Sequence, residues 1–193
     1  MKSSRPANQV RIIAGTWRGR RLSFEPVPGL RPTPDRVRET LFNWLSTVIH
    51  GARCLDLYAG SGALGIEAAS RGASEVVLVD HDPRVVAALS RQVEMLGAAQ
   101  IHLVQADVLD WLSGPARRFD IVFLDPPFLS HLLPSCMRRL EYHGWLADQA
   151  LVYIEAEQAL KIELPGNWEL LRSKKAGQVG YHLARRCGAS RAG

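Results

Sequence analysis

Short apolar runs alternate with longer amphipathic stretches from residue 51 onward. The apolar runs are Arg53 to Tyr58, Glu75 to Asp80, Ile101 to Gln105, Phe119 to Leu124 and Ala150 to Glu155. Apolar runs of this length, separated by segments with helical spacing, are typical of parallel strands buried between helices. The pattern therefore predicts an α/β protein with a mostly parallel sheet.

The alternation ends after residue 155. Two further strands, Trp168 to Ser173 and Val179 to Arg185, are predicted because only the Gly-containing turn Lys174 to Gln178 separates them. We therefore expect a seven-stranded sheet that ends in an antiparallel pair.

Capping residues mark the ends of the intervening helices. One helix is expected to begin near Gly62 and to end at Gly72, a residue type that suits a left-handed C-terminal position. The next has Asp82 as N-cap, Pro83 in its first turn and Gly97 at its end.

Residues 1–50 have a different pattern. Two short segments, Arg11 to Ala14 and Arg20 to Phe24, flank Gly15 to Gly19 and predict a basic hairpin. A helix should follow, with Thr33 as N-cap and Pro34 in its first turn. Its predicted apolar face is Val37, Leu41, Trp44, Leu45 and Val48, and its other face carries Arg36, Thr40 and Asn43. We expect two parts, an N-terminal extension (1–50) and a main domain (51–193).

Charge is distributed unevenly along the 193 residues. The formal net charge is +6 for residues 1–50, −6 for residues 51–165 and +5 for residues 166–193. Basic ends that flank an acidic centre suggest that the ends meet a polyanion. Trp17, inside the basic stretch Arg11 to Arg21, adds an aromatic ring and favours nucleic acid.

The sequence gives no sign of a membrane span, a signal peptide or a metal site. Its N-terminus is polar, and charged residues interrupt the apolar runs, so we expect a cytoplasmic protein with no membrane partner. Cys54, Cys136 and Cys187 are far apart and lack ligand spacing, which argues against disulfides and zinc. Nothing in the sequence demands a dimer, and we expect a monomer.

A glycine-rich turn joins the first strand of the main domain to its first helix. The turn, Asp56 to Gly65, contains Gly60, Gly62 and Gly65 at the spacing of dinucleotide-binding proteins, and Asp80 ends the next strand. Glycines let a ligand approach the helix N-terminus, and a carboxylate at the second strand end can accept from ribose hydroxyls. This motif alone is compatible with a dinucleotide or with S-adenosyl-L-methionine.

Three features favour S-adenosyl-L-methionine over a dinucleotide. Asp56 can attract the ammonium of a methionine moiety, whereas it would repel a pyrophosphate. Asp107, after the third strand, can accept from an adenine amino group, although it suits the N-cap of Val108 to Leu112 equally well. A dehydrogenase of this length would also have almost no chain left for a substrate domain.

The tetrapeptide Asp125 to Phe128 follows the fourth apolar run and can hold a planar amine. Prolines lack a backbone N–H, and an ionised Asp125 can only accept hydrogen bonds. The Asp125 carboxylate and the Pro126 carbonyl can bind the two amine hydrogens, while Phe128 stacks on a base. Guanine and adenine both carry such an amine, so these residues alone do not decide the base.

With these residues assembled, the chain resembles the RsmD family, the bacterial small-subunit ribosomal RNA guanine-N2 methyltransferases. The resemblance covers nearly the whole chain and rests most specifically on the block Arg31 to Asn43. The other matching pieces are Arg11 to Gly15, Trp17 to Arg20, Asp56 to Gly65, Asp125 to Phe128 and Ala176 to Val179. The family has Glu or Asp at the position of Asp80 and a small or polar residue at that of Asp107, so it supports Asp80 more strongly.

The resemblance implies a Rossmann-like class I methyltransferase fold and methylation of one guanine N2 in 16S ribosomal RNA of the small subunit. It also implies that the N-terminal extension covers the cofactor site and contacts RNA. Five arginines of the extension are the expected phosphate contacts: Arg11, Arg18, Arg20, Arg21 and Arg36.

Two other functions remain open from the sequence. The first is methylation of another amine, either adenine N6 in DNA or RNA or a protein glutamine. The second is an RNA-binding ribosome assembly factor that retains the fold without turnover.

Overall fold

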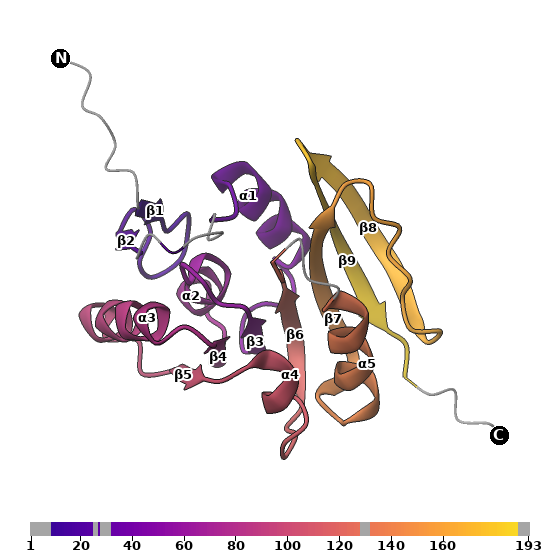
Figure 1. Cartoon of the computed structure of the whole chain (residues 1–193). Helices are drawn as coiled ribbons and strands as arrows, with labels where there is room; N and C mark the ends of the chain where they lie inside the picture. Colours follow the sequence, from indigo (N-terminus) through magenta and orange to yellow (C-terminus); the bar gives the residue numbers. More distant parts are fainter. Residues whose placement is uncertain (1–8, 25–26, 28–31, 128–131, 189–193) are drawn as a thin grey trace.

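A seven-stranded sheet forms the centre of the computed structural model, which describes residues 9–24, 27, 32–127 and 132–188 (Figure 1). The spatial order of its strands is β5-β4-β3-β6-β7-β9-β8. Their bounds are β3 (Arg53–Leu57), β4 (Glu75–Asp80), β5 (Ile101–Gln105), β6 (Phe119–Leu124), β7 (Leu146–Glu157), β8 (Trp168–Ala176) and β9 (Val179–Arg186).

The predicted sheet is confirmed. Strands β3 to β7 run parallel to one another, and β9 runs antiparallel to both β7 and β8. Strand β7 begins earlier than expected because Leu146 pairs with Phe119 at the start of β6. The ladder is irregular just beyond this pair, where Gln149 has a φ of 64°. The residues just before Ala150 are polar, so the pattern of apolar residues did not reveal the first part of β7.

Helices cover both faces of the sheet. On one face lie α1 (Asp35–Trp44), α2 (Ala63–Ser70) and α3 (Pro83–Leu96), and on the other lie α4 (Val108–Trp111) and α5 (Leu133–Tyr142). Because side chains alternate along a strand, each face has its own core. Phe123 and Tyr153 face the first group of helices, and Leu124 and Ile154 face the second. In the described part of the chain no helix is long and apolar enough to cross a membrane.

Helix α3 confirms the predicted caps. The Asp82 side chain accepts a hydrogen bond from the Arg84 amide, and Gly97 ends the helix in the left-handed conformation. Helix α2 begins after Gly62, also as expected. Helix α5, which covers much of the second core, was not predicted.

Two expectations for α1 were wrong. Pro34, not Thr33, is the N-cap residue, because the Thr33 hydroxyl donates instead to Glu155 Oε1 at 3.0 Å. The helix ends at Trp44, so Val48 does not share its apolar face and is 45% exposed. Val37, Leu41 and Leu45 are buried as predicted.

The N-terminal hairpin is shorter than predicted. It consists of β1 (Gln9–Arg11) and β2 (Arg21–Ser23), with Val10 opposite Leu22. Ile13 and Ala14 leave the ladder because their backbone amides donate to the Glu67 carboxylate of α2, at 2.8 and 3.0 Å. A distant carboxylate thus replaces the strand partner that the sequence pattern implied.

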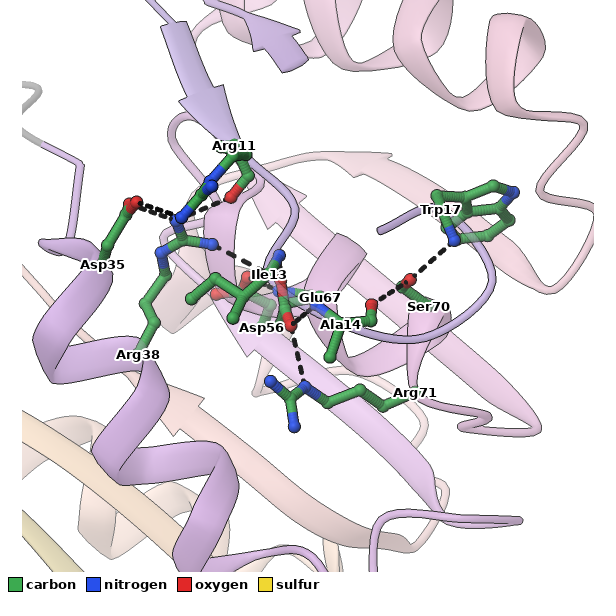
Figure 2. Close-up of polar contacts among 11 residues, drawn as sticks. Arg11, Ile13, Ala14, Trp17, Asp35, Arg38, Asp56, Glu67, Ser70 and Arg71 are labelled. Atoms are coloured by element: carbon green, nitrogen blue, oxygen red, sulfur yellow. Dashed lines mark hydrogen bonds and ion pairs between the residues drawn. The ribbon is translucent and has the colours of Figure 1, made fainter. Parts of the chain in front are cut away.

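The segment that follows β1 is held tightly against α2 (Figure 2). Glu67 also accepts from Arg71 Nε at 2.7 Å and pairs with Arg38, whose side chain is 1% exposed. Ser70 Oγ accepts from the Trp17 amide and donates to the Ala14 carbonyl. Trp17 is buried in the first core, so its ring is not free to stack on a base. Trp17 therefore does not support the predicted binding of nucleic acid.

Candidate functional site

The strand order reverses between β3 and β6. The chain runs from β3 outward to β4 and β5, then returns to the other side of β3 as β6. In open α/β sheets, ligands bind at the carboxyl ends of the strands at such a switch point. The glycine turn after β3 and Asp125 after β6 flank it directly.

The glycine turn is held open by backbone contacts. The amides of Tyr58 and Ala59 both donate to the Val79 carbonyl of β4. Gly62 is the N-cap of α2 with a φ of 73°, and a Cβ there would lie 2.6 Å from Leu89. A larger residue there would therefore be strained and would collide with the Leu89 side chain, so the turn requires glycine at this position.

Asp80 connects the end of β4 to this turn. Its Oδ2 accepts from the Gly60 amide and its Oδ1 from the Asp82 amide, each at 2.9 Å. An ionised carboxylate has about four acceptor positions, so these two bonds leave capacity for ribose hydroxyls. The geometry fits the predicted cofactor contact and gives Asp80 an additional role in shaping the turn.

Asp56 lies beneath the turn and is 2% exposed. Its Oδ2 accepts from the Gly65 amide at 2.9 Å, which fixes the first turn of α2. Burial raises the pKa of Asp56 to about 7, opposed by the Gly65 hydrogen bond and reinforced by the charges of Asp80 and Glu155. A nearby ammonium would stabilise its ionised form, and this contact stays a prediction.

Asp107 is an exposed N-cap. It accepts from the amides of Leu109 and Asp110 at the start of α4. The capping interpretation is confirmed, and the proposed contact with adenine stays a prediction.

Asp125 and the buried Pro126 follow β6, while Phe128 lies outside the described residues. Desolvation raises the pKa of Asp125 well above its ordinary value, and the negative charges of Glu155 and Asp56 raise it further. The Asp125 carboxylate is therefore more basic than an ordinary aspartate, and it accepts hydrogen bonds strongly once ionised.

Two features of the site were missed from the sequence. Glu155, near the end of β7, is 4% exposed and influences the charge of Asp125. Tyr58 has a φ of 73°, an uncommon conformation for an aromatic residue, and its hydroxyl lies 3.2 Å from Cys136 Sγ. A local pattern reveals neither, because each depends on tertiary contacts.

The five predicted RNA-binding arginines are all exposed. Two of them also have partners within the protein: Arg20 donates to the Met95 carbonyl at 3.2 Å, and Arg11 lies 3.8 Å from Asp35. Arg18 and Arg21 lie around the hairpin, and Arg36 lies on the outer face of α1. These positions are compatible with phosphate contacts, which stay a prediction.

Comparison with known proteins identifies the family. The family described as Conserved hypothetical protein 95 matches residues 10–185. Ribosomal RNA small subunit methyltransferase D of Escherichia coli (strain K12) is 48% identical over 181 residues, which cover 93% of this chain and 91% of that protein. The chain belongs to the RsmD family.

Solved structures agree with the RsmD assignment. The structure of the E. coli protein yhhF is 49% identical and has a TM-score of 0.85, covering 93% of this chain and 99% of that chain. A more distant fold match, 17% identical with a TM-score of 0.61, is the structure of an RNA methyltransferase from Salinibacter ruber in complex with S-adenosyl-L-homocysteine; it covers 84% of this chain and 98% of that chain. The Rossmann-like class I methyltransferase fold is therefore confirmed.

Proposed function

We propose that this protein is an S-adenosyl-L-methionine-dependent methyltransferase that modifies the N2 amine of a guanine in 16S ribosomal RNA of the small subunit. The observation that carries the proposal is the pairing of two features across the switch point. The glycine turn with Asp80 lies at the ends of β3 and β4, and Asp125 with Pro126 lies at the end of β6. The relative named as a ribosomal RNA methyltransferase supports the substrate class.

The residues around the glycine turn fit the cofactor. Gly62 lets the chain turn into α2, Asp80 retains acceptor capacity for ribose hydroxyls, and buried Asp56 is suited to a cationic ammonium. Asp107 would accept from the adenine amine. When bound, S-adenosyl-L-methionine supplies a methyl group on a positively charged sulfur.

Asp125 and Pro126 would orient the amine of the target base. The Asp125 carboxylate and the Pro126 carbonyl each accept one amine hydrogen, which aims the nitrogen lone pair at the methyl group. A nitrogen that gains a methyl group must lose a proton, and a carboxylate with a raised pKa is suited to receive it. Phe128 would stack on the base.

Guanine suits this site because its pairing edge presents N1–H and the N2 amine as adjacent donors. An ionised carboxylate can accept from both. Adenine presents an acceptor at N1 beside its amine, which an ionised Asp125 would repel.

The exposed arginines of the extension would contact RNA phosphates. They lie on β1, on β2, on α1 and in the loop between β1 and β2, the part that we expect to cover the cofactor site. We expect a monomer that acts in the cytoplasm on the small subunit or an assembly intermediate.

Transfer of a tritiated methyl group to small-subunit particles from a strain without this enzyme tests the proposal. We expect label in 16S RNA at a single guanine N2, located by mapping the modified base. Label at adenine N6 or in protein would favour a related amine substrate. Particle binding without transfer would favour an assembly factor.

A further inference from the structure

Glu155 places a second buried carboxylate beside Asp125. Its Oε1 accepts from Tyr153 OH at 2.8 Å and from Thr33 Oγ1 at 3.0 Å. Both bonds are buried, and Thr33 is 122 residues away in the chain. None of the cofactor or amine contacts proposed above uses this group.

Strand register places Glu155 next to Asp125. Leu124 of β6 pairs with Ile154 of β7, so Asp125 and Glu155 are the next residues along the two neighbouring strands. Leu124 and Ile154 face the second core, and alternation turns the following pair toward the face covered by α1 and α2. Thr33, which directly precedes the N-cap of α1, lies on that same face.

The Thr33 bond fixes the start of α1 to this strand edge. The Val37 and Arg38 amides donate to the Pro34 carbonyl, so the first turn of the helix follows directly from the anchored residue. Farther along, the Arg38 guanidinium binds Asp35, the Arg11 carbonyl and Glu67. The outer face of the same helix carries Arg36, a predicted phosphate contact.

Stability alone does not account for a carboxylate at this position. Burying a charge beside other carboxylates is costly, and a well-packed apolar group often stabilises a core more. Burial raises the pKa of Glu155, while the bonds from Tyr153 and Thr33 oppose that change. A costly group that bonds the N-terminal segment and adjoins the amine-holding carboxylate suggests a role in the site.

We propose that Glu155 is a positioning residue for methyl transfer, which holds Thr33 and the start of α1 in place relative to Asp125. The position of the N-terminal extension, which we expect to contact RNA, is then fixed relative to the Asp125 carboxylate. The inference rests on the proposed function, because it assigns Glu155 a role in that reaction.

Variants of the Thr33–Glu155 bond test this role. Thr33→Val removes the hydroxyl at nearly constant volume, Thr33→Ser retains it, and Glu155→Gln replaces the charge with an amide. We expect kcat/KM for small-subunit particles to fall roughly tenfold in Thr33→Val and in Glu155→Gln, the loss expected for a charged hydrogen bond. Thr33→Ser should remain near the wild-type value, and the cofactor Kd should stay within about twofold in all three.

Two further readouts separate positioning from simple destabilisation. At a pH above the acid limb, the double variant Thr33→Val with Glu155→Gln should lose no more than the larger of the two single losses, because Thr33→Val removes the Thr33–Glu155 hydrogen bond and Glu155→Gln weakens the same bond to one with a neutral amide oxygen. Hydrogen exchange at the Val37 and Arg38 amides should be faster in Thr33→Val than in Thr33→Ser, under conditions where both are fully folded.

The pH profile gives an independent check on Glu155. Among the described residues, the charged or titratable groups that act on Asp125 are Asp56 on β3 and Glu155 and Tyr153 on β7, and Tyr181 on β9 acts in turn on Tyr153. Removing the charge of Glu155 should move the acid limb of kcat/KM to lower pH, because Asp125 then ionises more readily.

Three outcomes would overturn the inference while leaving the proposed function intact. They are a wild-type kcat/KM in both single variants, additive losses in the double variant, and a loss in Thr33→Ser equal to that in Thr33→Val. Failure of the wild-type enzyme to label the particles would overturn the proposed function and this inference together.

Discussion

The Asp80 carboxylate accepts hydrogen bonds from two backbone amides, so a substitution of Asp80 changes the glycine turn as well as the proposed cofactor contact. The Gly60 and Asp82 amides both depend on its carboxylate. Asp56 and Asp107 similarly accept from Gly65 and from Leu109 and Asp110. Each proposed cofactor contact therefore also shapes the loop that would receive the cofactor.

Asp80→Ala should lower cofactor affinity by about 1.5 to 3 kcal/mol, the range for a hydrogen bond to a charged group, or tenfold and more in Kd. Calorimetry with S-adenosyl-L-methionine measures this directly. Asp82→Ala is the matched control, because it removes a neighbouring carboxylate that caps α3. It should lower folding stability only modestly, through the lost helix cap, and leave Kd unchanged. An unchanged Kd in Asp80→Ala would show that Asp80 does not bind the cofactor.

Asp56→Asn should change how the stability of the cofactor-free protein depends on pH. The folded-state pKa of about 7 lies above the ordinary value of 3.8, so the folded protein binds more protons than the unfolded chain between these values. The stability from this group is present below the lower value and is lost as pH rises toward 7. Asparagine does not titrate, so this decline, about 1.4 kcal/mol per pH unit at most, should disappear.

Urea unfolding at several pH values measures the effect of Asp56→Asn. Relative to the wild-type protein, the variant should gain stability between pH 4 and pH 8. Parallel stability curves for the two proteins would show that Asp56 titrates normally.

The sequence predicted the residues whose role follows from local context. Asp80 ends an apolar run, Asp125 directly follows one and Asp56 lies near the end of another, so their meeting near one edge follows from a parallel sheet. Glu155 also lies at a strand end, but its partner Thr33 is 122 residues away and had a plausible alternative role as an N-cap. Only tertiary structure distinguishes the two roles of Thr33.

Among the elements, the segment between β1 and β2 departed clearly from expectation. The Ile13 and Ala14 amides, predicted to extend the hairpin, bind Glu67 instead, so β1 ends at Arg11. The helices with clear caps, such as α3, were predicted closely because Asp82, Pro83 and Gly97 act locally. An element that takes its hydrogen bonds from a distant carboxylate has no such local signal.

Glu67→Ala should destabilise the protein by about 3 to 5 kcal/mol. The Glu67 side chain is fully buried, and its loss leaves the Ile13 and Ala14 amides without their acceptor and takes one of its partners from the buried Arg38. Glu75→Ala is a suitable control, since Glu75 also pairs with two arginines, Arg53 and Arg117, but lies nearer the surface.

Denaturant unfolding compares the two glutamate variants. The Glu75 variant should lose only about 1 kcal/mol, as expected for a partly exposed ion pair. Similar losses in both variants would mean that the Glu67 network does not hold the N-terminal segment in place.

For the molecule as a whole, the fold brings the start of α1 and the turn between β8 and β9 to the edge that carries Asp125. Val179 of β9 pairs with Glu157, so the turn between β8 and β9 lies just beyond Glu155. Figure 1 shows this hairpin tip on the same side of the sheet as the start of α1. Lys174 and Lys175 precede the turn and are exposed, which places C-terminal positive charge near the extension.

This arrangement predicts strongly salt-dependent RNA binding. Each phosphate contact contributes about 0.7 to 0.9 to the slope of log affinity against log salt. Arg11→Ala, Arg36→Ala and Lys174→Ala should each reduce that slope by roughly one contact in filter-binding titrations with small-subunit RNA. Arg117→Ala, just before β6 at the opposite edge of the sheet, should leave the slope unchanged. Equal effects from all four variants would contradict the proposed RNA-binding edge.

The central claim is that Asp125 orients the amine that receives the methyl group. Single-turnover methyl transfer to small-subunit particles by Asp125→Ala tests it most directly, with the cofactor Kd measured on the same protein. Asp120→Ala is the matched control, because Asp120 lies on the same strand and binds the Arg53 amide at the far end. We predict a rate loss on the order of a hundredfold or more for Asp125→Ala, with a Kd within about twofold of wild type and a normal rate for Asp120→Ala. Transfer by Asp125→Ala at the wild-type rate would contradict the account.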